Sequence, residues 1–204
     1  MAATVSVTAA RQSGSSPRSA AALIAIAGLA LFLRFEDLSL KPLHSDESVN
    51  GWFSLRLYWW NVYQYQPADY HGPFLYYVNL VAFWLFGPSE FSLRLGTALV
   101  GGGTPLLLWP LRAWLGRSGV LLAGVAIAVA PAMVYYSRTV IHETYLLAFT
   151  LVWLVGILEY LREPRIRAAL LAAAGAAGCF CNKETALITG GGLAFGLALA
   201  LLID

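Results

Sequence analysis

Four short clusters of ionisable residues interrupt an otherwise apolar chain, and they contain the side chains needed for acid–base chemistry. The first cluster places His44, Asp46 and Glu47 just beyond an apolar segment. Two adjacent carboxylates offer a general base whose neighbour raises its basicity. Ionisable groups beside a bilayer are costly to desolvate, so such clusters mark a candidate site. The other three clusters are Tyr70-His71, Arg138 with His142-Glu143, and Asn182-Lys183-Glu184.

The basic residues of these clusters suit the binding of a phosphate leaving group. Arg138 and Lys183 would neutralise its charge, arginine through its fork of donors and lysine as a point charge. Arg138 and His142 stand four positions apart, so on a helical turn they would share one face. The plainer interpretations are ion pairs, Arg138 with Glu143 and Lys183 with Glu184, or snorkelling of Lys183 to the membrane interface.

The acidic pair and the aromatic stretch that follows it also have structural interpretations. Ser45, Asp46 and Glu47 would cap the N-terminus of a helix, although capping needs only one such residue. Tyr70 and His71 precede a Gly-Pro turn, where aromatic faces and polar tips suit the recognition of a sugar. The alternative for the aromatic residues is a belt that anchors the protein among the lipid headgroups.

A divalent cation, Mg²⁺ or Mn²⁺, is a further expectation from residue chemistry. Histidine and carboxylate side chains are suitable ligands. Asp46, Glu47, His142 and Glu143 would supply them if their loops converge, and His44 would add another. The spacing of these residues is not in itself a metal-binding motif, so this expectation depends on the fold.

The composition is that of an integral membrane protein. Of 204 residues, 59% are hydrophobic and only 12% are charged, whereas a soluble domain has about 25% charged residues. The formal net charge of +2 and the lack of a basic patch argue against nucleic acid as a partner. Cys179 and Cys181 lie too close together in an apolar run for a disulfide framework, and we interpret them as small hydrophobic residues.

The apolar segments predict an all-α polytopic membrane protein with about six transmembrane helices. A helix needs roughly 20 residues to span a bilayer. Residues 73–86 form a shorter segment that is rich in aromatic residues, so we expect it to lie along the outer surface. Residues 45–60 have apolar side chains at near-helical spacing and predict a second surface helix. The expected spans lie within residues 20–33, 93–111, 120–136, 144–161, 168–180 and 186–203.

The positions of the arginines orient these segments. If residues 73–86 lie on the surface, the N-terminus and the arginine-rich connections all face the cytoplasm, as the positive-inside rule requires. We therefore expect a multi-pass plasma-membrane protein with a disordered cytoplasmic tail over residues 1–19 and a transmembrane module over residues 20–204. Its first outer loop would be residues 34–93. All four ionisable clusters then face the outer side, whereas a crossing by residues 73–86 would split them between the two sides.

The motifs resemble those of the GT-C glycosyltransferases, which include protein O-mannosyltransferases, aminoarabinose lipid A transferases and the catalytic subunits of oligosaccharyltransferase. The shared pattern is an acidic pair after the first span, two surface helices and a second acidic residue after the third span. F-G-P-S-E-F-S-L-R-L at residues 86–95 is similar to the stretch before the family's second span. H-S-D-E, Y-H-G-P-F-L-Y-Y and S-R-x-x-x-H-E are most similar to a prokaryotic subfamily described as flippase-activity-associated.

The resemblance implies transfer of a sugar from a polyprenyl-phosphate donor to an acceptor hydroxyl or amide at the outer face, with inversion. The acceptor would be a glycan, a lipid or a protein, and membrane lipids would surround the enzyme. By this resemblance Asp46 is the catalytic base, Glu47 its partner and Glu143 the second acidic residue, while His71 lies near the donor phosphate. The other candidates for substrate binding are His44, Tyr70, Arg138, His142, Lys183 and Glu184.

Two other classes of function compete with a transferase. A transporter or lipid-flippase component would use the ionisable residues as a proton relay, but such residues are expected near the bilayer midplane, and here they lie at helix ends. A non-catalytic lipid-binding membrane protein is the second alternative. Because members of the resembled family continue with further spans, we also expect this chain to be truncated at its C-terminus.

Overall fold

The computed structural model describes residues 17–65 and 71–203, and within these ranges the chain forms helices and no strand. Tyr70 and most of the expected N-terminal tail lie outside the described residues. The elements are α1 (Pro17–Phe35), α2 (Ser45–Trp60), α3 (Phe74–Phe86), α4 (Glu90–Gly103), the 3₁₀ helix η1 (Thr104–Leu111), α5 (Arg112–Val129), α6 (Pro131–Ser137), α7 (Glu143–Arg162), α8 (Ile166–Asn182) and α9 (Ala186–Ile203).

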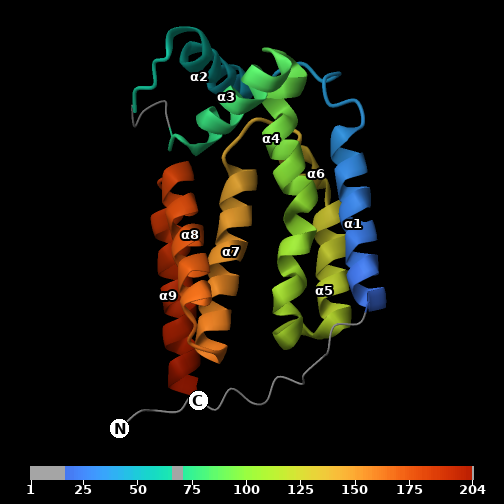
Figure 1. Ribbon diagram of the computed structural model, residues 1–204, viewed down its shortest axis with the longest axis vertical. Coiled ribbons are helices and arrows are strands. Elements are labelled where there is room, and N and C mark those ends of the chain that lie inside the picture. The colour runs from blue at the N-terminus through green and yellow to red at the C-terminus, as the bar shows by residue number, and fades with distance from the viewer. Residues whose placement is uncertain (1–16, 66–70, 204) are drawn as a thin grey trace.

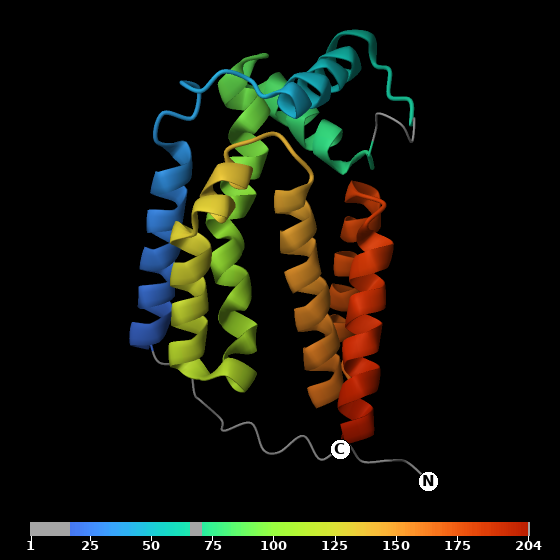
Figure 2. The same cartoon turned by 180° about the vertical axis from the view of Figure 1, so that it is seen from behind.

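The long helices form a bundle that is covered at one end by α2 and α3. In Figure 1, α1, α4, α5, α7, α8 and α9 run along the long axis of the molecule, whereas α2 and α3 lie across its upper end. The α6–α7 and α8–α9 connections lie at that same end in both views (Figures 1 and 2). The segments that carry the ionisable clusters are therefore gathered at one end of the bundle.

Three helical stretches are long and apolar enough to cross a membrane by length and composition: Pro17–Phe35, Glu90–Val129 and Glu143–Arg162. The 40-residue stretch is not one straight helix, because Gly116 has φ 68° and ψ 172° within it. Glycine adopts this left-handed backbone without steric cost. Here α4 runs away from the covered end and α5 runs back toward it (Figure 1). The remaining apolar helices, α3, α8 and α9, are shorter.

The expected continuous segment over residues 120–136 is divided, because Pro131 separates α5 from α6. Proline has no N–H, so the Ile127 carbonyl has no helical partner four residues later. The guanidinium of Arg34 replaces that partner, donating to the Ile127 carbonyl at 3.1 Å and to the Ala128 carbonyl at 3.1 Å. Arg34, which is only 1% exposed, thus ties α1 to the break between α5 and α6.

Close approach of α7 and α8 depends on small residues. A Cβ atom at Gly156 would lie 2.3 Å from the backbone nitrogen of Ala172, and one at Gly175 would lie 2.4 Å from that of Trp153. Small residues that let two backbones approach are characteristic of helix packing in membranes. This contact holds the N-terminus of α7 beside the C-terminus of α8, where two of the ionisable clusters lie.

Helix α3 has one buried and one exposed face. Leu75, Tyr76 and Phe83 are at most 2% exposed and belong to a cluster that joins α2, α3, α4 and α7. Val81 and Trp84, on the other face, are 50% and 68% exposed. An apolar helix that lies across the end of the bundle with an exposed aromatic face has the character expected of an interfacial helix.

Candidate functional site

The acidic pair lies in the first turn of α2, and the helix has the bounds that the sequence predicted. His44 is the N-cap residue: its Nδ1 accepts from the backbone N–H of Asp46 at 3.5 Å, while Glu47 Oε2 accepts from the backbone N–H of His44 at 3.0 Å. This reciprocal capping fixes where α2 begins. Capping is therefore carried by His44 and Glu47, and the carboxylate of Asp46 stays exposed.

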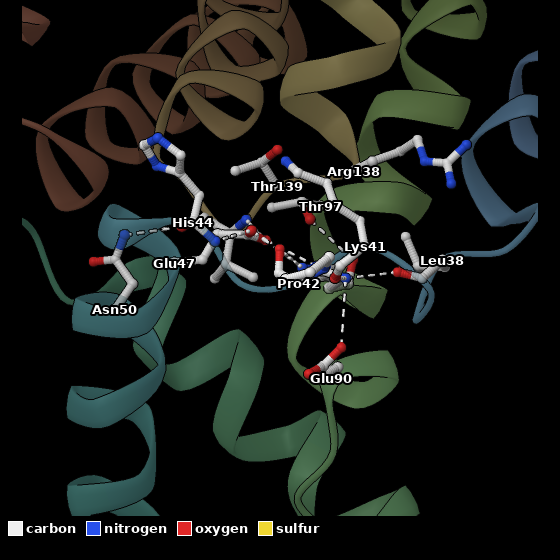
Figure 3. Close-up of polar contacts among 12 residues, drawn as sticks. Leu38, Lys41, Pro42, His44, Glu47, Asn50, Glu90, Thr97, Arg138 and Thr139 are labelled. Carbon is white, nitrogen blue, oxygen red and sulfur yellow. Dashed lines mark hydrogen bonds and ion pairs between the residues drawn. The ribbon is translucent and has the colours of Figure 1, made fainter.

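Glu47 is completely buried and ionically paired. Arg94 of α4 donates to both carboxylate oxygens, from Nε at 2.8 Å and from Nη2 at 3.1 Å, and the backbone N–H of Val140 donates at 3.1 Å. Burial alone would raise the pKa of Glu47, but the hydrogen bonds and charge of Arg94 outweigh it, and the pKa is lowered. Glu47 is therefore ionised and has no solvent-exposed surface. Its polar contacts hold the first turn of α2 in place (Figure 3).

Arg94 extends this anchor to the segment between α1 and α2. Its Nη1 donates to the carbonyls of Leu38 at 2.8 Å and Lys41 at 2.9 Å, and its Nη2 to that of Pro42 at 3.4 Å. Both guanidinium and carboxylate are taken out of water, so their pairing is required for either to be tolerated. The pair joins the α1–α2 segment, α2, α4 and the α6–α7 connection at one point.

A polar cavity of about 250 Å³ lies beside the exposed carboxylate of Asp46. Its wall contains side chains from α2, from the segment before α3, from the start of α7 and from the α8–α9 connection. Four of the predicted catalytic or binding residues besides Asp46 are in it. The lining residues are Asp46, Val49, Asn50, His71, Ile141, His142, Glu143 and Lys183.

Lys183 and Glu143 form an ion pair at this cavity, in place of the expected pairs of Arg138 with Glu143 and of Lys183 with Glu184. The side chain of Lys183 is mostly buried, with 18% of its surface exposed, while 44% of the Glu143 side chain is exposed. The pair places one cation and one anion at the wall, so an anionic ligand group would compete with Glu143 for the lysine.

His71 and Glu184 form a second link between the α2–α3 connection and the α8–α9 connection. His71 Nδ1 lies 2.9 Å from Glu184 Oε2, and the hydroxyl of Tyr65 donates to Glu184 Oε1 at 3.0 Å. Burial opposes ionisation of Glu184, but hydrogen bonds from its own backbone, from His71 and from Tyr65 prevail and lower its pKa. Glu184 therefore orients His71 at the edge of the cavity.

Gly72 brings these two connections into contact. Its N–H donates to the carbonyl of Asn182 at 3.1 Å, and a Cβ atom at this position would lie 2.2 Å from the carbonyl oxygen of Cys181. Only glycine permits this approach of two backbones. Asn182 in turn donates from Nδ2 to the carbonyl of His142 at 2.8 Å, which connects the start of α7 to the same contact.

His142 is buried between these elements, with 2% of its surface exposed. Its ring packs edge-on against His71 and Tyr76, with centroid separations of 4.9 Å and 5.7 Å. Burial, with a smaller contribution from the neighbouring His71, lowers the pKa of His142 to about 3. His142 is therefore a neutral imidazole at physiological pH.

Arg138 does not lie at the cavity. The prediction that it shares a helical face with His142 is wrong, because α6 ends at Ser137 and residues 139–142 are not helical. Its guanidinium donates instead to the carbonyls of Leu33 at 3.0 Å, Glu36 at 2.6 Å and Asp37 at 3.2 Å. These carbonyls at the end of α1 lack helical partners, and arginine satisfies them. In Figure 3 the guanidinium points away from Glu47 and Asn50.

Two further predicted residues differ from their expected placement. His44 is exposed and caps α2 but is not among the residues that line the cavity. The buried carboxylate of Glu47 is likewise absent from the lining, although the neighbouring Asp46 is part of it. Arg94 and Asn50 were not among the predicted site residues, although a charged residue within an apolar segment, such as Arg94, itself signals a buried partner.

The expected cation ligands are not gathered into a metal site. Within residues 17–65 and 71–203, no group of three or more His, Cys, Asp or Glu side chains has an arrangement that would hold a metal ion. The reason is visible in the geometry: Glu47 is turned toward Arg94, and Glu143 is paired with Lys183.

A bundle of apolar helices with a cavity of ionisable side chains at one end defines a membrane protein with a candidate site at the ends of its helices. Residues 70–204, more than half of the chain, match the family described as dolichyl-phosphate-mannose-protein mannosyltransferase, and the chain belongs to this family. Comparison with curated proteins and with solved structures gave no match.

The family assignment confirms the expectation of a membrane glycosyltransferase of GT-C type, in which the sugar comes from a lipid-linked donor. The matched part begins after α2. It includes His71, Arg94, His142, Glu143 and Lys183, whereas the role of Asp46 rests on its position in the cavity.

Proposed function

We propose that this chain transfers a sugar from a polyprenyl-phosphate donor to an acceptor hydroxyl, with inversion at the anomeric carbon. The observation that carries the proposal is the convergence of Asp46, His71, Glu143 and Lys183 on one polar cavity. These residues come from four separate parts of the sequence. A family that uses lipid-linked sugars supplies the class of donor.

The proposed topology has six spans: α1, α4 with η1, α5 with α6, α7, α8 and α9. Helices α2 and α3 would rest on the outer face of the plasma membrane, with the N-terminus in the cytoplasm. The arrangement of α2 and α3 across one end of the bundle supports this topology (Figure 2). The arginine-bearing α7–α8 connection lies at the opposite end, which is the cytoplasmic end by the positive-inside rule.

The proposed reaction uses Asp46 as general base. Its exposed carboxylate takes the proton of the acceptor hydroxyl as that oxygen attacks the anomeric carbon, and the bond between this carbon and the phosphate oxygen breaks. The departing lipid phosphate carries the negative charge, and Lys183 and His71 would stabilise it. Glu47 holds the first turn of α2 in place, and Arg138 donates hydrogen bonds to the carbonyls at the end of α1. No step requires a metal ion.

Glu143 has a role that depends on the ligand. Its carboxylate pairs with Lys183. When a phosphate draws the lysine away, the same carboxylate becomes free to accept hydrogen bonds from the acceptor or the sugar. The acceptor would be a glycan, a lipid or a protein that reaches the cavity from the outer side. The motifs of the chain support membership of the flippase-activity-associated subfamily.

Replacement of Asp46 by asparagine tests this proposal. Asp46→Asn removes the base but keeps the size and shape of the side chain, so transfer should fall by about 100-fold or more. The measurement is release of radiolabelled sugar from polyprenyl-phosphate mannose by protein in proteoliposomes. Asp37→Asn is the matched control: Asp37 lies at the end of α1 with φ 48°, which asparagine tolerates.

The control variant should retain wild-type transfer. Full activity of Asp46→Asn would refute the assignment of the base. Equal loss in both variants would show that the carboxylate acts through general electrostatics and not through its position in the cavity.

A further inference from the structure

Val140, in the connection between α6 and α7, is held to α2 at both of its backbone polar groups. Its N–H donates to Glu47 Oε1 at 3.1 Å, and its carbonyl accepts from Asn50 Nδ2 at 2.8 Å. Glu47 and Asn50 stand three positions apart, so they lie on one face of α2. Val140 itself is fully buried. The α6–α7 connection is therefore fastened to the beginning of α2 through a single residue.

The orientation of the Asn50 side-chain amide follows from its two partners. The Val140 carbonyl can only accept a hydrogen bond, so the amide nitrogen must face it. The amide oxygen accepts from the hydroxyl of Tyr76, on α3, at 3.1 Å. Exchange of the two ends would place the oxygen against the Val140 carbonyl. The Asn50 side chain, which is buried, is therefore held in one orientation by α3 and by the α6–α7 connection.

This contact connects two opposite parts of the cavity wall. On α2, Asp46 and Asn50 stand four positions apart and both line the cavity. On the other side of the contact, the chain continues from Val140 into residues 141–143, which line the cavity as well. A shift of Val140 away from α2 would therefore move the carboxylate of Glu143 relative to that of Asp46.

Ser54, one turn further along α2, makes a polar contact of a different kind. Its hydroxyl accepts from Asn79 Nδ2, on α3, at 2.9 Å and donates to the Asn50 carbonyl at 2.8 Å. Ser54 is fully buried, but it is not among the residues that line the cavity. These hydrogen bonds of Ser54 are made within α2 and to α3. Ser54 therefore serves as the reference for a buried contact that stabilises the fold alone.

We propose that Asn50 is a positioning residue for sugar transfer: its hydrogen bond to the Val140 carbonyl keeps Glu143 aligned with Asp46. This inference rests on the proposed function, in which Asp46 takes the acceptor proton and Glu143 binds the acceptor or the sugar. It goes further in assigning the alignment of these two carboxylates to a residue that acts through the backbone of the α6–α7 connection. A displacement of about 1 Å can lower the rate of a reaction by about 100-fold.

The test compares Asn50→Leu with the matched control Ser54→Ala. Leucine has the branched shape of asparagine but neither its donor nor its acceptor. The full chain is reconstituted in proteoliposomes, and initial rates of sugar release are measured per mole of folded protein over a series of polyprenyl-phosphate mannose concentrations. In Asn50→Leu, kcat should fall by about 10-fold or more, while the KM for the donor stays within about twofold of the wild-type value. In Ser54→Ala, kcat and KM should both stay near their wild-type values.

A second variant, Asn50→Asp, keeps the shape of the side chain and makes the bond to Val140 depend on pH. The introduced carboxyl can donate to the Val140 carbonyl only while it is protonated, and burial beside the anionic Glu47 raises its pKa. The ratio of its kcat to that of the wild type should therefore fall as the pH is raised. A role confined to stability predicts a constant ratio per mole of folded protein. Because the protonated carboxyl can make both hydrogen bonds of asparagine, this variant should fold at mildly acidic pH.

The outcomes separate this inference from the proposed function. A wild-type kcat in Asn50→Leu overturns the inference alone, and so does an equal loss of kcat in Ser54→Ala or a change confined to KM. If Asn50→Leu does not fold, a ratio in Asn50→Asp that is constant with pH overturns it. In these cases the proposed function still stands if the wild type transfers sugar and Asp46→Asn does not. A wild-type protein that does not transfer the sugar of polyprenyl-phosphate mannose overturns the proposed function and this inference with it.

Discussion

At the scale of single residues, the adjacent carboxylates of Asp46 and Glu47 have opposite environments. Glu47 has no exposed surface and is bound by Arg94 and two backbone N–H groups, whereas Asp46 is exposed at the cavity. A helix rotates successive side chains by about 100°, so one member of an adjacent pair can face the bundle while the other faces the ligand. The buried carboxylate of Glu47 holds the first turn of α2 in position, and the exposed carboxylate of Asp46 is available for chemistry.

Removal of the buried charge should destabilise the protein. Glu47→Gln keeps the shape of the side chain but leaves the guanidinium of Arg94 without its counter-ion, so we expect a loss of about 3 kcal/mol in the free energy of unfolding. Chemical unfolding of the protein in mixed micelles measures this change in the free energy of unfolding. Glu163→Gln is the matched control, because the pair of Glu163 with Arg165 is exposed on both sides and should change stability by less than about 1 kcal/mol.

The same residue predicts how stability depends on pH. The pKa of Glu47 is lowered from its ordinary value of 4.5 in the folded protein, so its ionised form stabilises the fold above that value. This contribution is lost as the pH falls through the lower, folded pKa. Acid unfolding should therefore be less steep in Glu47→Gln than in the wild type. Identical stability of the two proteins at neutral pH would contradict the role of the pair.

At the scale of elements, the cavity depends on the contact between the α2–α3 and α8–α9 connections. Gly72 donates to Asn182, Glu184 binds His71 and Tyr65, and Lys183 lies between these contacts. A displacement of the α8–α9 connection would move Lys183 away from Glu143 and widen the cavity. The backbone contact at Gly72 is therefore as important for the site as the side chains that line it.

Gly72→Ala should damage both stability and transfer. Its Cβ would lie 2.2 Å from the Cys181 carbonyl oxygen, and two backbones must separate to admit it, which costs about 1–3 kcal/mol. Gly191→Ala is the control, since a Cβ there meets nothing within 4 Å and alanine favours a helix. Unfolding and transfer assays on both variants check this; wild-type behaviour of Gly72→Ala would show that the connections are not in tight contact.

The helices were largely predictable from the sequence, because apolar length and helical spacing act locally. Helix α2 has the predicted bounds, and the other expected segments overlap helices of the structure. The reversal at Gly116 falls in the connection between the predicted spans 93–111 and 120–136, whereas the division at Pro131 was not predicted. The division at Pro131 requires Arg34 to satisfy the carbonyls that the proline leaves unpaired, and no local pattern shows that an arginine 93 residues away will do so.

The candidate site was predictable only in part. Residue types identified Asp46, His71, His142, Glu143 and Lys183, which the structure brings to one cavity. They did not reveal that Glu47 turns inward or that Arg138 binds the end of α1, because both depend on partners remote in sequence. The direction in which such a charged side chain points depends on the residue that pairs with it, and the sequence does not show which residue that is.

At the scale of the whole molecule, α2 separates two different environments. The polar cavity adjoins one face of the helix, while the opposite face borders an apolar groove of about 450 Å³ that includes Gly51, Trp52, Leu55 and Trp59. The polar and apolar parts of the covered end are therefore on opposite sides of one helix. A sugar would bind on the polar side, where the titratable groups lie.

Photo-crosslinking of the donor sugar tests the location of the active site most directly. Polyprenyl-phosphate mannose with a diazirine on its sugar is irradiated with the protein in proteoliposomes, and the labelled residues are identified by mass spectrometry. We expect adducts within residues 46–50, at 141–143 and at Lys183, and competition by unlabelled donor should abolish them. Adducts confined to Trp52, Trp59 and the apolar groove would contradict the assignment of the polar cavity as the site of transfer.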